Sequence, residues 1–134
     1  MKILDFGARG AVKSSSIQYM TGFDGLINST HIGFVDGTED DFAINPQLAF
    51  AMWSRASTSA AVMMAPSEVM LDFSHIAAIQ FFASGHEDSP FPKKEAVFRI
   101  WFDQGELFIP TARHPHLDKN AYLRMLIDAW KKHV

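Results

Sequence analysis

The chain has 134 residues, of which 48% are hydrophobic, and its formal net charge is −3 with the histidines neutral. This length predicts a single domain, residues 1–134, that can bury its own core. The lack of cysteine excludes a disulfide framework, a thiol nucleophile and a cysteine-ligated metal site. Lysine and arginine never form runs longer than two residues, so the basic stripe typical of a nucleic-acid binder is missing. No apolar run has transmembrane length and charge interrupts the N-terminus too early for a secretory signal, so we expect a cytoplasmic protein that binds neither membrane nor nucleic acid.

The first third of the chain predicts short elements separated by glycine and polar residues. Residues 2–6 are expected to form a short strand, residues 14–16 form a polar connector or a helix start, and residues 17–20 are too few to assign. Side chains alternate between apolar and other types over residues 30–35, which is typical of a strand. The acidic run 36–41 that follows is expected to be a loop.

A helix is predicted to begin at Asn45, with asparagine as its N-cap and Pro46 at its first helical position. Alanine is frequent over the following residues, which favours a helix. Apolar side chains also alternate over residues 48–54, so a strand is the alternative there.

Three strands are predicted in the middle of the chain. They cover residues 60–64, 69–73 and 76–83, with a bend at residues 74–75 between the last two. The proline-containing residues 84–94 are expected to form a long loop, and loops of this length often carry function.

The last forty residues give the clearest pattern. Side chains alternate over residues 96–102, and a turn of Asp, Gln, Gly and Glu leads into a return strand that ends at Pro110. Asp118 is a good N-cap for an amphipathic helix over residues 119–132, whose apolar side chains share one face.

These elements predict an α+β fold. We expect one antiparallel sheet of about five or six strands, packed against the C-terminal helix, with a second helix after Asn45. A partly open barrel closed by a terminal helix has the same order of elements. No internal repeat is apparent in the sequence.

Two groups of residues are candidates for binding a protein partner. The first is the acidic run with Asp36, Glu39, Asp40 and Asp41, which can form a solvated turn or an acidic face for a basic partner. It lacks the alternating ligand spacing of a calcium-binding EF-hand loop. The second is the pair Arg99 and Trp101, which share one face of a predicted strand and have the composition of a binding hot spot. The alternative is that the N-terminal segment covers Trp101.

Histidines offer a second type of site. His114 and His116 are two residues apart in an extended segment, so their imidazoles can converge on one metal ion. The candidates for a third ligand are His86, Glu87 and Asp88. The same loops, 84–94 and 111–117, carry the histidines and carboxylates that a small enzyme would use for acid–base chemistry. Solvated histidines in loops are the simpler interpretation.

The sequence favours a small non-enzymatic protein that engages a protein partner, such as a domain that neutralises a toxin or an accessory subunit. A small enzyme, metal-dependent or not, is the alternative. No cofactor is predicted, and a homodimer is compatible with the composition.

Overall fold

The computed structural model describes residues 3–22, 28–57, 62–64, 68–83, 95–111 and 116–133. It confirms an α+β fold with antiparallel sheets and a C-terminal helix. The prediction of a single sheet of five or six strands, or of a partly open barrel, is wrong. The described residues form ten strands in three antiparallel sheets of two, three and five strands. The strands are short because 3₁₀ turns, at Gly7–Arg9, Ser14–Ser16 and Phe73–His75, repeatedly redirect the chain.

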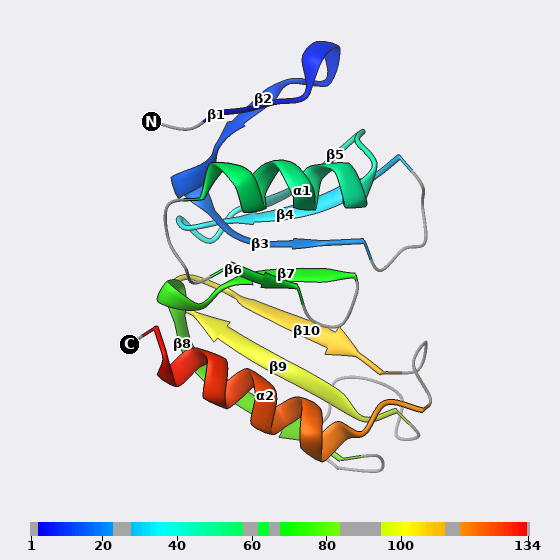
Figure 1. Ribbon diagram of the computed structural model, residues 1–134, viewed down its shortest axis with the longest axis vertical. Helices are drawn as coiled ribbons and strands as arrows, with labels where there is room; N and C mark the ends of the chain where they lie inside the picture. Colours follow the sequence, from blue (N-terminus) through cyan, green and yellow to red (C-terminus); the bar gives the residue numbers. More distant parts are fainter. Residues whose placement is uncertain are drawn as a thin grey trace.

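The chain passes twice through the same order of elements: a two-strand hairpin, a 3₁₀ turn, a three-strand antiparallel meander and an α-helix. The first set, which we call repeat 1, consists of β1 (Ile3–Asp5), β2 (Ala11–Lys13), β3 (Ile17–Thr21), β4 (Thr30–Phe34), β5 (Glu39–Phe42) and α1 (Pro46–Ala56). The second set, repeat 2, consists of β6 (Val62–Met64), β7 (Val69–Asp72), β8 (Ile76–Phe82), β9 (Val97–Phe102), β10 (Glu106–Pro110) and α2 (Lys119–Lys131). Figure 1 shows each helix next to the strands of its own repeat.

The strand register confirms that the two sets are equivalent. In each repeat, the pairing of the first two meander strands is interrupted by an irregularity after its first residue pair. The flanking pairs are Ile17–Phe34 and Tyr19–Gly33 in repeat 1, and Ile76–Phe102 and Ala78–Trp101 in repeat 2. The residue after the second meander strand then donates its N–H to the last residue of the 3₁₀ turn, at 2.9 Å in both repeats. The chain therefore contains an internal structural repeat that is not apparent in the sequence.

The two repeats are joined through a shared sheet. Strand β7 of repeat 2 pairs with β3 of repeat 1, which gives a five-stranded sheet in the order β5-β4-β3-β7-β6. Alternate residues of this sheet face opposite ways. Met20 and Met70 belong to the hydrophobic cluster that includes Trp53 of α1. Tyr19 and Leu71 belong to the cluster built on the β8–β10 sheet and α2.

Both predicted helix starts are confirmed. The Asn45 side chain accepts a hydrogen bond from the Leu48 N–H at 3.2 Å, and the helix that follows rules out the alternative strand over residues 48–54. The Asp118 side chain accepts one from the Ala121 N–H at 3.0 Å. The predicted strands at 30–35, 69–73, 76–83 and 96–102 are also confirmed to within two residues at each end. Neither of the two described helices is long and apolar enough to cross a membrane.

Candidate functional site

The acidic run is a strand and not the loop that the sequence predicts. Glu39, Asp40 and Asp41 belong to β5, where their backbones pair with β4 at the edge of the five-stranded sheet. Backbone pairing does not depend on apolar side chains, and charged side chains are a common way to protect an edge strand from aggregation. Only Asp36 lies in the connecting turn, where its carboxylate accepts hydrogen bonds from the N–H and hydroxyl of Thr38. These two bonds lower the pKa of Asp36.

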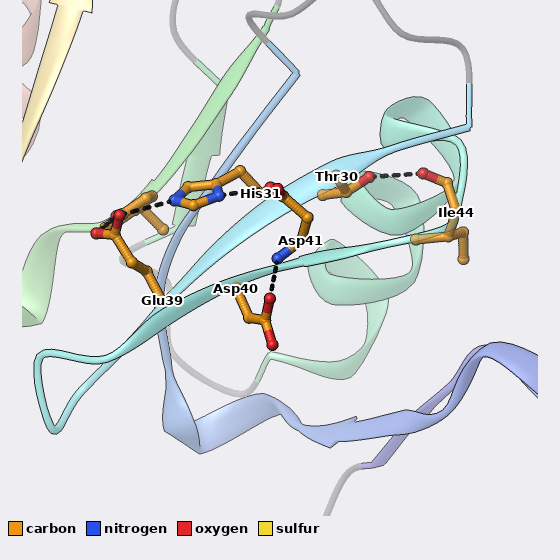
Figure 2. Close-up of polar contacts among 7 residues, drawn as sticks. Thr30, His31, Glu39, Asp40, Asp41 and Ile44 are labelled. Atoms are coloured by element: carbon orange, nitrogen blue, oxygen red, sulfur yellow. Dashed lines mark hydrogen bonds and ion pairs between the residues drawn. The ribbon is translucent and has the colours of Figure 1, made fainter.

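The alternation of the strand divides the three carboxylates of β5 between two faces. Glu39 and Asp41 face the same side as His31, which lies opposite Asp41 on β4. Figure 2 shows the imidazole between them, with Nδ1 at 2.6 Å from Asp41 Oδ1 and Nε2 at 3.3 Å from Glu39 Oε1. Asp40 faces the other way, and its carboxylate accepts a hydrogen bond from the Asp41 N–H at 2.8 Å.

Tyr19 reaches one of these carboxylates, that of Glu39, across β4. Its hydroxyl donates to Glu39 Oε2 at 3.1 Å, and its ring lies against Gly33 and stacks on Phe102 with ring centroids 5.4 Å apart. A Cβ atom at Gly33 would lie 2.0 Å from a Tyr19 ring carbon, so only glycine leaves room for this path. Burial raises the pKa of the Tyr19 phenol, and the charge and hydrogen bond of Glu39 raise it further, so the hydroxyl stays a donor.

A pocket of about 430 Å³ opens beside this cluster, between the two repeats. Its lining combines carboxylates, aromatic rings and one imidazole. The lining residues are Tyr19, Thr21, His31, Glu39 and Asp41 from repeat 1, with Glu106, Leu107 and Phe108 from repeat 2. Three carboxylates therefore line a single concave surface with the ring of Phe108.

Arg99 and Trp101 lie in repeat 2 next to the pocket residues Glu106 and Phe108. The Arg99 guanidinium pairs with Glu106, with Nε at 2.8 Å from Oε2, and lies 3.8 Å above the Trp101 ring centroid and 5.1 Å from that of Phe108. Trp101 remains 38% exposed and donates to the Gln80 side chain at 3.2 Å. This exposure favours the outer-face interpretation of Trp101 over coverage by the N-terminal segment.

The ion pairs of the two repeats occupy equivalent positions. His31 and Glu39 in repeat 1 have the same register positions as Arg99 and Glu106 in repeat 2. In each repeat, a basic side chain of the second meander strand thus lies against a glutamate that is the first residue of the third meander strand. Repeat 1 differs because Asp41 supplies a second carboxylate where repeat 2 has Phe108.

The predicted histidine site is not tested. His86 and His114 lie outside the described residues, and His116 is exposed just before α2. Within the described ranges, no group of three or more histidines and carboxylates is arranged to hold a metal ion.

Sequence reasoning missed three central members of the cluster, Tyr19, His31 and Glu106. Tyr19 lies in a stretch that is too short to assign from the sequence, and the sequence predicts His31 only as part of a strand. One sequence feature pointed to the cluster: Glu39 and Asp41 are two residues apart, so their side chains would face the same side of an extended chain. Comparisons of the chain with protein-family models, with curated proteins and with solved structures find no match.

Proposed function

We propose that this protein binds a protein partner, and that the pocket between the repeats receives a basic side chain of that partner. The observation that carries the proposal is the set of three carboxylates, Glu39, Asp41 and Glu106, on one pocket beside Phe108. An arginine suits such a pocket best. Its planar guanidinium bonds carboxylates in pairs and stacks on aromatic rings, and it is more weakly hydrated than an ammonium group.

The charge balance of the cluster supports a cationic ligand. Arg99 is paired with Glu106, and the single imidazole of His31 lies between two carboxylates. Glu39 and Asp41 are 56% and 61% exposed at their side chains, so they can also attract a basic partner from a distance. Electrostatic complementarity of this kind speeds association more than it strengthens the final complex. A protein that neutralises a basic toxin, or an accessory subunit of a larger assembly, would use such a surface.

The other partner-binding residues have different roles in this proposal. Arg99 and Trp101 form a neighbouring surface that an incoming chain would contact after its basic side chain is seated. Asp40 adds negative charge on the opposite face of β5, and Asp36 lines a separate recess with Lys13. Neither of these carboxylates is expected to contact the basic side chain.

A small enzyme is the second candidate, because His31 beside Asp41 is the arrangement of a histidine base oriented by a carboxylate. A general base needs one ring nitrogen free to accept a proton from the substrate. Both nitrogens of His31 face carboxylate oxygens, at 2.6 and 3.3 Å. The geometry therefore favours binding over acid–base catalysis.

The test uses the isotope-labelled chain and two short peptides, one containing arginine among neutral residues and one containing glutamate instead. We expect the arginine peptide to shift the backbone amide signals of Glu39, Asp41 and Phe108, and the glutamate peptide to leave them unchanged. Asp41→Asn should weaken arginine-peptide binding by about tenfold or more, because it removes a charge-assisted hydrogen bond worth about 1.5–3 kcal/mol.

Asp40→Asn is the matched control, since it makes the same change of charge on the same strand but on the other face. Equal losses in the two variants would mean that diffuse charge, and not the pocket, attracts the peptide. Signals that do not move with either peptide would refute the proposal.

A further inference from the structure

Within the described residues, the two repeats meet at one complete junction, and it is made by strand pairing. The hairpin of repeat 2 adds to the first meander strand of repeat 1, so that β7 pairs with β3. The register of this junction places Tyr19 opposite Leu71, Met20 opposite Met70, and Thr21 opposite Val69. A hairpin strand of one repeat is thus built to complete the sheet of the repeat before it.

The equivalent strands at the two ends of the chain have no such neighbour among the described residues. Strand β8 is equivalent to β3, and it is an edge of its sheet, whose order is β10-β9-β8. Strand β2 is equivalent to β7, and it pairs with β1 alone. Figure 1 shows the β1–β2 hairpin at one end of the long axis and the β8–β10 sheet with α2 at the other, so these two strands cannot meet within one copy.

Burial differs between the filled junction and the two open edges. At the junction, Tyr19 and Met20 of β3 are 4% and 0% exposed. The equivalent residues of β8, Ala78 and Ile79, are only partly buried.

The same contrast holds for the hairpin strands. Met70 of β7 is 4% exposed because it packs into the core of the other repeat. Its equivalent Ala11 of β2 is exposed. Each end of the chain therefore presents one half of a junction that the middle of the chain completes.

We propose that copies of this chain associate head to tail, with β2 of one copy pairing antiparallel to β8 of the next. The register of the internal junction carries over directly, so that Ala78 lies opposite Val12 and Ile79 opposite Ala11 of the second copy. The N–H and C=O groups that point outward from β2 and from residues 78–80 of β8 bond one another, and the small or apolar side chains at the edge become buried. This proposal rests on the internal repeat and is independent of the pocket.

The contact joins two different surfaces, so it is heterologous, and contacts of this type build rings or open rows in place of a two-fold dimer. The two complementary edges lie at opposite ends of the molecule, which directs growth along the long axis (Figure 1). Pairing of β8 with β2 of the next copy would join the three-stranded and two-stranded sheets into a five-stranded sheet between copies, equivalent to the five-stranded sheet inside the chain.

The absence of cysteine allows a clean cross-linking test. We would prepare the full chain as Ala11→Cys and as Ile79→Cys, give one a mass tag, and oxidise each alone and as a mixture. The proposal predicts a mixed disulfide between the two variants that exceeds either homodimer. The control is Ala11→Cys mixed with Asp40→Cys, which places the second thiol on the edge strand β5 and should give only background. Preferential cross-linking of Ile79→Cys to itself would show two-fold pairing, and mixed product at the control level would show no contact; either result overturns the proposal.

Sedimentation of the unmodified chain over a concentration series provides a test without cysteine. The average mass should rise with concentration, and Ile79→Lys or Ala11→Glu, on the two sides of the contact, should each return the chain to single copies. Leu48→Lys is the control, because Leu48 is a 51% exposed apolar residue on α1 and belongs to neither edge strand. Circular dichroism of each variant would check that it is folded. A single-copy mass at every concentration, or an equal effect of Leu48→Lys, would contradict head-to-tail pairing.

Discussion

Gly33→Ala is the substitution that most directly tests the architecture of the candidate site. A Cβ atom built at Gly33 lies 2.0, 2.3 and 2.6 Å from three carbons of the Tyr19 ring. The backbone at Gly33 can accept alanine, because no positive φ is recorded there. Any destabilisation must therefore come from the collision with Tyr19, whose ring is held between β4 and Phe102.

The loss in the free energy of unfolding depends on how much of its buried packing the Tyr19 side chain loses. Overfilling a packed site costs about 1–3 kcal/mol, and full loss of a buried aromatic side chain costs about 3–5 kcal/mol. Alanine recovers about 0.5–1 kcal/mol, because glycine is disfavoured inside a strand. We expect a net loss of about 2–3 kcal/mol in the free energy of unfolding, or about 10 °C in Tm for a chain of this size.

The assay is urea unfolding of a double-mutant cycle that combines Gly33→Ala with Tyr19→Ala. In the Tyr19→Ala background there is no ring to displace, so Gly33→Ala should be neutral or stabilising by about 0.5–1 kcal/mol. The two substitutions should therefore be strongly coupled. Equal effects of Gly33→Ala in both backgrounds would refute the placement of the Tyr19 ring over Gly33.

Two further predictions concern the helix starts and the turn before β5. Asn45→Ala and Asp118→Ala should each lower the free energy of unfolding by about 1 kcal/mol, because each removes an N-cap acceptor, and thermal melts of the two variants will measure it; an unchanged Tm would contradict the capping geometry. The pKa of Asp36 is lowered by its bonds from Thr38, so its ionised form stabilises the fold above the ordinary aspartate pKa, and this contribution is lost as pH falls through the lowered value. Asp36→Asn should therefore be less stable than the parent chain near neutral pH, and the difference should shrink in acid; a difference that does not change with pH would count against it.

The sequence predicted those elements whose signals are local. The N-caps Asn45 and Asp118 indicate where the two helices begin, and each capping interaction spans only four consecutive residues. The alternation over residues 96–102 is long enough to distinguish a strand from a helix. The prediction failed at β3 and β5, for opposite reasons. Strand β3 is buried on both faces and so carries no alternation, while β5 is a charged edge strand held by its backbone.

The internal repeat was invisible because the two copies agree in backbone and differ in side chains. Aligned strand positions that keep their residue include Ile17 with Ile76, Ile32 with Ile100, Phe34 with Phe102, and Glu39 with Glu106. Such scattered identities fall below what inspection of one sequence can detect. Register and turn bonds reveal the repeat because they record the path of the chain independently of its side chains.

Those side-chain differences also explain why a pocket forms beside repeat 1. In repeat 2, the long side chain of Arg99 lies over Trp101 and Phe108 and fills the face of the sheet. In repeat 1, the aligned residues are His31, Gly33 and Asp41, which are smaller at every position. Space is therefore left on the face of repeat 1.

The large residue of the Tyr19–Gly33 pair lies on the first meander strand, whereas in the Ala78–Trp101 pair it lies on the second. This exchange lets Tyr19 cross β4 and hold Glu39 by its hydroxyl. The proposed binding surface thus depends on side chains that differ between the repeats. The proposed head-to-tail contact depends on the strand pairing that the repeats have in common. A substitution can remove one without touching the other: Asp41→Asn should spare self-association, and Ile79→Lys should spare binding of the arginine peptide.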